Sequence, residues 1–269
     1  MFIDGTFKFI PKPFYQCLIV MVFDDQTDCY VPVFYVLLTS KTQQIYIQAL
    51  RWIQITVARK ICPVTITCDF EIALQNAISI VFTDAIVNGC LFHWKQAIQR
   101  KLIDLKFKYE IVERMMWDHT LEILTLINPS EIKWKGIPYV RSIIDGDLDH
   151  DDMVKMEKFW NYFDKFWMRS PSFIVTWNVF GHYKDKQMKL QRTNNGLERY
   201  NRDLNEKFSG KQSLLSFIKI LEEEARKKVR LLEDIRTGST VNKRKRDDEG
   251  DEMETESGPK VQSFYHSIN

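Results

Sequence analysis

The chain has 269 residues, of which 45% are hydrophobic, and a formal net charge of only +2. This composition is sufficient for a sizeable core, and the nearly neutral charge excludes a general attraction to nucleic acid, so any basic surface must be local. The five cysteines are odd in number and scattered, which excludes a disulfide framework, and no apolar run approaches the roughly 20 residues of a membrane-spanning helix. We expect an intracellular globular protein without a membrane partner.

The first third of the chain predicts a mixed sheet. Strand-like segments at 1–10, 15–23 and 30–39 are rich in β-branched and aromatic residues, and the short breaks between them indicate an antiparallel meander. A capping-box sequence then opens a helix that ends near residue 60, and a strand at 64–68, a helix at 70–82 and a strand at 86–92 follow. The order β-β-β-α-β-α-β predicts an α/β fold with helices on the faces of a mixed sheet.

The rest of the chain predicts helices. From 93 to about 189 the helical stretches include 153–168, whose many aromatic residues favour packing in a helical subdomain over base stacking. A long amphipathic helix at 213–236 has apolar residues close to a heptad, which predicts either packing back onto the domain or a homodimer seam. From 238 onward the charges are segregated, which indicates disorder, and a basic run at 243–246 fits a nuclear localisation signal.

Three carboxylates stand at positions that suggest chemistry. Asp4 interrupts an apolar run, Asp69 follows the strand at 64–68, and Glu198 lies on a late helix. Divalent cations such as Mg²⁺ take oxygen ligands, and a pair of them can assist phosphoryl transfer. Each acid also has a structural alternative: Asp4 with the following glycine as a hairpin turn, Asp69 as a helix N-cap, and Glu198 as the partner of Arg202 in an ion pair. Spacing alone leaves both interpretations open.

Five motifs occur in a fixed order along the chain. They are DGTF at 4–7, PVFYVLLTSKT at 32–42, DFE at 69–71, GCLFH at 89–93 and TNNGLE at 193–198. Together they resemble the transposase domain of Mutator-like elements (MULEs), from residue 1 to about residue 205. The resemblance implies a ribonuclease-H-like fold with an all-helical insertion before the last acidic residue. It also implies DDE-type cleavage and strand transfer of DNA in transposition, with two Mg²⁺ or Mn²⁺ ions bound by Asp4, Asp69 and Glu198 as the catalytic triad.

Other residues of these motifs are candidates for supporting roles. Cys90 and His93 match a Cys-x-x-His motif of the family, but a structural zinc needs four ligands, so we expect them to lie beside the acids or to contact DNA, as Asn194 and Asn195 could. A buried free cysteine is the alternative for Cys90. Glu71 is expected to support the start of the helix at 70–82.

Binding to DNA would need local basic groups, because the net charge is small. The candidates for phosphate contacts, on transposon ends and target DNA, are Lys95, Arg100, Lys101, Arg192, Arg199 and Arg202. Their alternative is an ordinary solvated helix face. No small-molecule cofactor is expected.

The resemblance also suggests a domain division. Residues 1–104 would form the first part of a catalytic core, 105–189 the helical insertion, 190–237 the second part of the core, and 238–269 a disordered charged tail. Relatives carry an amino-terminal zinc-binding module that recognises DNA and has no counterpart here, so we expect a truncated or domesticated copy in the nucleus. One hypothesis is an active transposase, and the other is a catalytically silent DNA-binding or regulatory protein.

Overall fold

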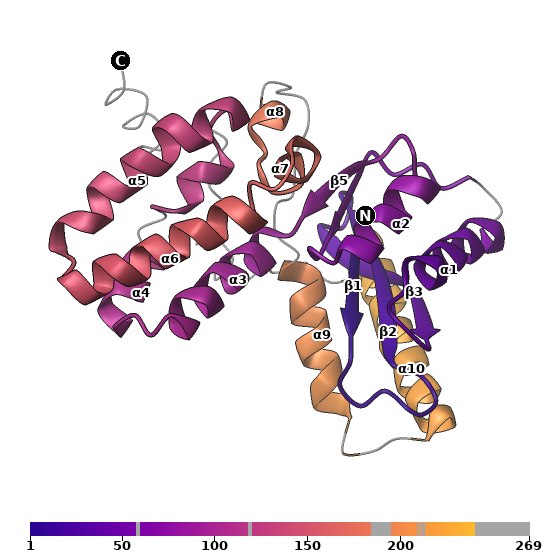
Figure 1. Ribbon diagram of the computed structural model, residues 1–269. Coiled ribbons are helices and arrows are strands. Elements are labelled where there is room, and N and C mark those ends of the chain that lie inside the picture. Colours follow the sequence, from indigo (N-terminus) through magenta and orange to yellow (C-terminus); the bar gives the residue numbers. More distant parts are fainter. Residues whose placement is uncertain (58–59, 118–119, 184–194, 209, 211–212, 240–269) are drawn as a thin grey trace. The chain divides into compact units, whose positions relative to one another are not determined.

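The computed structural model describes residues 1–57, 60–117, 120–183, 195–208, 210 and 213–239 (Figure 1). The chain divides into two compact units. One contains the described residues of the ranges 1–90 and 191–244, and the other contains the described residues of the range 91–190. The sequence predicts domain boundaries after residues 104, 189 and 237, and this division stays a prediction.

The first unit is built on a mixed sheet of five strands among its described residues. The strands are β1 (Phe2–Thr6), β2 (Gln16–Asp24), β3 (Cys29–Leu38), β4 (Thr65–Cys68) and β5 (Ile86–Gly89). Their order in the sheet is β3-β2-β1-β4-β5, with β1–β2 and β2–β3 antiparallel and β1–β4 and β4–β5 parallel. The predicted mixed α/β sheet is therefore confirmed.

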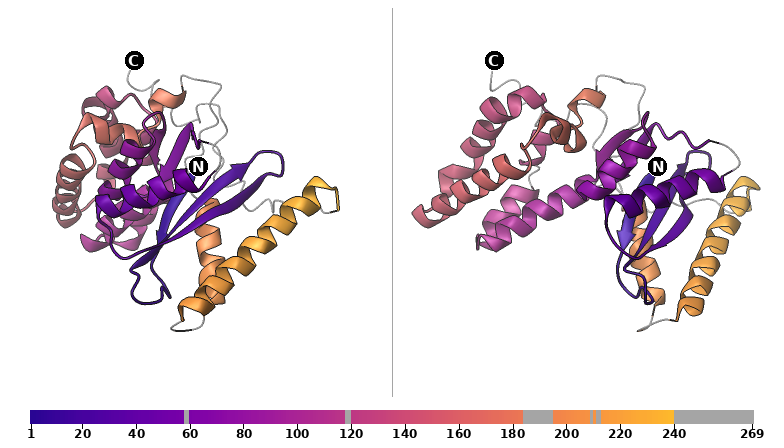
Figure 2. Two further views of the ribbon diagram at one scale, coloured as in Figure 1. Left: turned by 90° about the vertical axis from the view of Figure 1, so that its right-hand side faces the viewer. Right: turned by 45° about the vertical axis from the view of Figure 1, so that its right-hand side comes forward.

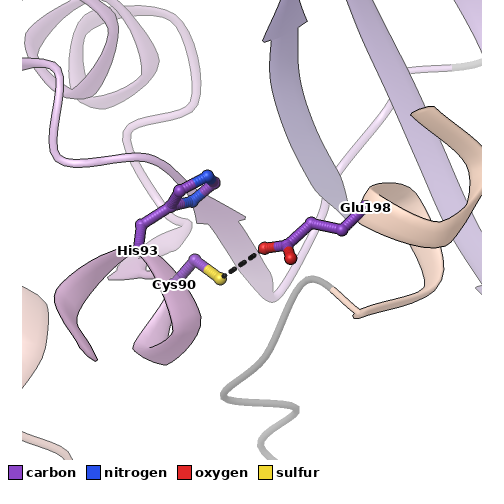
Figure 3. Close-up of side chains that lie close together, drawn as sticks. All are labelled: Cys90, His93 and Glu198. Atoms are coloured by element: carbon purple, nitrogen blue, oxygen red, sulfur yellow. Dashed lines mark hydrogen bonds between the residues drawn. The ribbon is translucent and has the colours of Figure 1, made fainter. Parts of the chain in front are cut away.

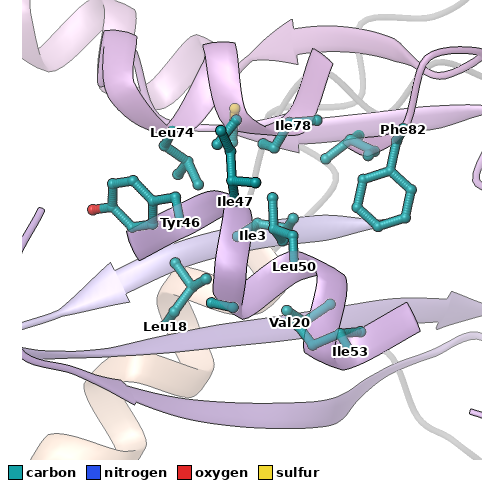
Figure 4. Packing of buried hydrophobic residues seen from close by; sticks show 14 of the residues in the cluster. Ile3, Leu18, Val20, Tyr46, Ile47, Leu50, Ile53, Leu74, Ile78 and Phe82 are labelled. Atoms are coloured by element: carbon teal, nitrogen blue, oxygen red, sulfur yellow. The ribbon is translucent and has the colours of Figure 1, made fainter. Parts of the chain in front are cut away.

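Helices α1 (Gln43–Thr56) and α2 (Ile72–Val81) cover one face of this sheet. Alternate residues of the strands, among them Ile3 and Leu18, pack there against apolar side chains of both helices (Figure 4). Because side chains alternate along a strand, the neighbouring residues point to the other face. The central strand β2 is consequently apolar on both sides.

The opposite face is covered by α9 (Asn195–Lys207) and α10 (Leu214–Arg236), drawn in orange to yellow in Figures 1 and 2. A second apolar cluster joins Phe2, on β1, to Leu197 of α9 and to Phe217 of α10. The long helix predicted at 213–236 thus packs back onto its own domain. The alternative of a homodimer seam stays a prediction.

The described part of the second unit is helical. Its elements are α3 (Leu91–Asp104), α4 (Tyr109–Trp117), η1 (Glu122–Thr125), η2 (Pro129–Glu131), η3 (Ile132–Gly136), α5 (Ile137–Ile144), η4 (Asp145–Asp147), α6 (His150–Phe166), α7 (Pro171–Trp177) and α8 (Phe180–Tyr183). Phe159, Phe163 and Trp167 are fully buried, so this part of the aromatic stripe is core, as predicted, whereas Phe166 is 37% exposed. None of the helices in the described part of the chain combines the length and apolar composition needed to cross a bilayer.

Several element boundaries differ from the prediction. The predicted strand at 86–92 ends at Gly89, and α3 begins at Leu91, so that the Cys-x-x-His motif bridges the end of a strand and the first turn of a helix. Helix α2 begins at Ile72 rather than at residue 70. Local propensity places ends poorly because the last turns depend on tertiary hydrogen bonds.

Candidate functional site

Strand register brings Asp4 opposite Asp69. Parallel strands β1 and β4 pair Phe2 with Thr67 and Ile3 with Cys68, so the next opposite positions are residues 4 and 69. Strand β5 continues the same row, since its last pair with β4 is Cys68 with Gly89 and the next residues are Asp69 and Cys90. Residue 4 of β1 therefore continues in one row with residues 69 and 90, which are the first residues beyond the ends of β4 and β5.

Asp4 lies inside a strand and not in a turn. It is half-buried in β1 and stands opposite Ile19 of β2 in the antiparallel register. One carboxylate oxygen, Oδ1, accepts the N–H of Gly5 at 2.8 Å, and the other, Oδ2, accepts the side-chain amide Nδ2 of Asn201 at 3.0 Å. The hairpin-turn alternative for Asp4 is wrong, because both flanking residues continue the strand pairing.

Asp69 lies just beyond the carboxyl end of β4, where sites on α/β sheets tend to collect. Its Oδ1 accepts the N–H of Phe70 at 2.5 Å. The N-cap residue of α2 is Glu71, so the alternative of Asp69 as the N-cap is wrong. The negative charge of Asp69 also lies close to the fully buried thiol of Cys68. Burial raises the pKa of that thiol well above its usual range, and Asp69 adds to the increase, so Cys68 stays protonated at neutral pH.

Glu198 comes to the same region from α9. It lies in the first turn of this helix, where the helix dipole favours a carboxylate. The buried thiol of Cys90 donates a hydrogen bond to Glu198 Oε1, with a sulfur-to-oxygen distance of 3.6 Å (Figure 3). Cys90 is itself tied to β4, because its N–H donates to the carbonyl of Cys68 at 2.8 Å.

The structure thus places Asp4 and Glu198 at the contact between the sheet and α9, with Asp69 just beyond the end of the neighbouring strand β4, and the three acids do not form a single cluster. Asp4 and Asp69 belong to the same row. Helix α9 contacts this row through two hydrogen bonds, one from Asn201 to Asp4 and one from Cys90 to Glu198. Among the described residues, however, Asp4, Asp69 and Glu198 do not form a group whose ligand atoms all lie within 4.8 Å of one another. A cation shared by all three would require these side chains to draw closer.

Glu71 is the N-cap residue at the start of α2, and its side chain reaches α1. Its carboxylate accepts the hydroxyl of Tyr46 at 2.9 Å and pairs with Lys41 at 3.1 Å, while Gln16 donates to Tyr46 at 2.6 Å. Its side chain makes no capping hydrogen bond to α2. The side chain of Glu71 therefore links the start of α2 to α1. It does not accept a hydrogen bond from the free backbone N–H groups in the first turn of α2.

The predicted DNA-contacting residues have varied surroundings. Arg199 and Arg202 are exposed on α9, the helix that carries Glu198. In the second unit Lys95 pairs at 2.8 Å with Glu122, which is only 4% exposed, so its charge is already compensated. The Lys101 ammonium lies 5.0 Å from the centre of the Tyr162 ring.

The remaining predicted residues are placed as follows. Arg100 contacts the side chain of Gln96 at the surface of α3, and His93 lies in the first turn of that helix, three residues after Cys90. Asn195 is the first residue of α9. Arg192 and Asn194 lie outside the described residues.

Sequence reasoning missed Asn201. The signal was present, because residues 197, 200, 201 and 204 follow the i, i+3, i+4, i+7 spacing of a buried helix stripe. Leu197, Tyr200 and Leu204 fill three of these positions with buried side chains, and an amide occupies the fourth. A polar residue in such a stripe requires a partner, and Asp4 is that partner.

A tyrosine pair also holds α9 on the sheet. The hydroxyls of Tyr35, on β3, and Tyr200 share a hydrogen bond. Burial raises the pKa of Tyr200 from 10.0 to about 12. Its phenol therefore stays protonated in the folded protein over a pH range in which the unfolded chain loses the proton.

Alkaline pH should reveal this pair. Because the unfolded chain binds fewer protons above pH 10, the free energy of unfolding should fall as pH rises from 10 to 12, with a share of up to about 2–3 kcal/mol from Tyr200. Urea unfolding of Tyr200→Phe should show a shallower fall than wild type over this range. Tyr109→Phe, at a tyrosine that is 72% exposed, is the control and should follow wild type. Equal slopes for wild type and Tyr200→Phe would contradict the assignment.

A family model matches the first third of the chain. The family model of the MULE transposase domain matches residues 1–97, which contain all five described strands, α1, α2 and the first half of α3. Asp4, Asp69, Cys90 and His93 fall inside the matched region, and Glu198 lies beyond it. A search of curated proteins found no match.

Proposed function

We propose that the protein is a transposase-derived enzyme that acts on DNA in the nucleus, because its residues 1–97 match the family model of the MULE transposase domain. In this proposal the first unit is a ribonuclease-H-like core of the DDE type. It hydrolyses a phosphodiester at a transposon end, and the 3′-hydroxyl that is released attacks a phosphodiester of the target DNA. The observation that carries the proposal is the row of residues 4, 69 and 90 beneath α9.

The chemistry of the donors fits a hard divalent cation. Asp4 and Asp69 offer carboxylate oxygens from adjacent strands, and Glu198 offers another from α9. The side-chain oxygen of Asn201, Oδ1, is buried beside Asp4 and has no hydrogen-bond partner. We propose that Asp4, Asp69 and Glu198 hold two Mg²⁺ or Mn²⁺ ions. When bound, such ions neutralise charge on the phosphate and lower the pKa of a coordinated hydroxyl.

The chain's own residues orient these acids. The N–H groups of Gly5 and Phe70 hold one oxygen each of Asp4 and Asp69, and Cys90 holds Glu198. Such hydrogen bonds fix the direction in which each carboxylate points, as groups that surround metal ligands commonly do. Arg199 and Arg202, exposed on the helix of Glu198, are the basic groups best placed to contact phosphates of DNA near the acids.

A second candidate is a nuclear DNA-binding or regulatory protein without catalysis. Two observations favour it: the three carboxylates are not drawn into one cluster among the described residues, and the family match ends before Glu198. Both candidates bind DNA, and only the first requires a divalent cation for turnover.

A nicking assay on supercoiled plasmid tests the proposal. We expect conversion to open circles with Mg²⁺ or Mn²⁺, and none with EDTA or with Ca²⁺, which binds oxygen ligands with looser geometry. Binding of the same DNA should persist in EDTA and weaken as salt rises. If the protein binds DNA but does not nick it with any cation, the second candidate is favoured. If it neither binds nor nicks DNA, both candidates are wrong.

A further inference from the structure

Asn201 is a polar residue in an otherwise apolar contact between α9 and the sheet. Its neighbours on the same helix face, Leu197 and Leu204, are 0% and 2% exposed, and they pack with Phe2 of β1. An apolar side chain at 201 would continue this cluster. Leaving a buried amide oxygen without a partner, as at Asn201 Oδ1, is destabilising. Packing alone therefore does not account for an asparagine here.

The amide does make one specific contact. Asn201 Nδ2 donates to Asp4 Oδ2 at 3.0 Å, across 197 residues of sequence. The N–H of Gly5 holds the other oxygen of the same carboxylate at 2.8 Å. Two donors from opposite sides thus define the plane of the Asp4 carboxylate. A donor on a rigid helix limits the rotation of an acid that would otherwise be oriented by its own strand only.

The same helix carries Glu198 one turn earlier. Residues three apart on a helix share a face, so the contact of Asn201 with Asp4 and that of Glu198 with Cys90 together set α9 against the row of strand residues. We infer that Asn201 is a positioning residue of the proposed cation site, which orients Asp4 for cation binding and sets the register of α9 over it. This inference rests on the proposed function.

Asn201→Leu is the most informative variant. Leucine has nearly the same shape as asparagine and would complete the apolar stripe, so the free energy of unfolding should stay the same or rise. Affinity for Mn²⁺, measured as loss of the free-ion signal in electron paramagnetic resonance, should fall about tenfold, as is usual when a group that orients a metal ligand is removed. A purely structural hydrogen bond would give the opposite pattern, with lower stability and unchanged affinity.

The control is Asn205→Leu, which makes the same substitution one turn further along α9. It should bind Mn²⁺ as wild type does. Asn201→Ala is a second variant in case leucine prevents folding, and it should show the same loss of affinity. If wild type binds Mn²⁺ and the folded Asn201 variants bind it equally well, the inference is wrong and the proposed function stands. If wild type binds no Mn²⁺, the proposed function fails and the inference fails with it.

Discussion

Asp69→Asn is expected to lower the rate of Mn²⁺-dependent plasmid nicking by at least about 100-fold, the scale seen when one group that stabilises the reacting charges is removed. Asn has the same shape as Asp, and its Oδ1 can still accept the N–H of Phe70, so the turn after β4 should be preserved. The variant loses only the negative charge at the carboxyl end of β4. Its urea unfolding curve and its affinity for DNA in EDTA should therefore match those of wild type.

Glu71→Gln is the matched control for this charge. Glu71 lies two residues further along the same motif, but its carboxylate is engaged by Tyr46 and Lys41 on the side of α1. Its neutral variant should nick DNA at close to the wild-type rate. Equal rates for wild type and Asp69→Asn would exclude a catalytic role for Asp69. Equal loss in both variants would indicate that general negative charge, and not this position, is required.

Gly196→Ala should both destabilise the first unit and impair nicking. In an unconstrained helix, alanine is more favourable than glycine by about 1 kcal/mol. Here a Cβ atom at 196 would lie 2.3 Å from the ring of Tyr30. That ring cannot easily move, because it packs against Phe2 and Phe23 with centroid distances of 5.2 and 5.0 Å. The start of α9 must shift instead, and Glu198, two residues later, shifts with it.

The expected cost is about 1–3 kcal/mol in the free energy of unfolding, typical of overpacking in a core. Nicking should fall further than the unfolded fraction explains when both are measured well below the unfolding transition. Gly181→Ala is the control, since nothing lies within 4 Å of a Cβ atom at that position of α8. If Gly196→Ala were as stable and as active as wild type, α9 would not be held at its start by this contact.

Much of the fold could be predicted because it depends on local patterns. Alternating apolar residues and short breaks predict the three antiparallel strands, and the later apolar runs predict the alternation of α1, β4, α2 and β5. The predicted ends of helices and strands agree less well with the structure. Local patterns predict a single strand from residue 86 to residue 92, through the motif around Cys90, but α3 begins at Leu91. We expect Glu71 to support the start of α2, and its side-chain partners are Tyr46 of α1 and Lys41 just before α1, which local sequence does not specify.

The identity of the candidate acids was available from the sequence, through the ordered motifs at 4–7, 69–71 and 193–198. Their mutual arrangement was not. Local sequence favours a hairpin turn for Asp4 and the glycine after it. Only the pairing of β1 with both β2 and β4 places Asp4 within a strand, beside the end of β4 that Asp69 follows. Likewise the local sequence gives Asn201 no partner, and only the packing of α9 on the sheet brings its amide to Asp4. Local propensity acts over a few residues, whereas strand register and helix packing are decided by burial and hydrogen bonds between segments almost 200 residues apart. The sequence by itself therefore determined which acids are present, and the tertiary structure decided which of them face one another.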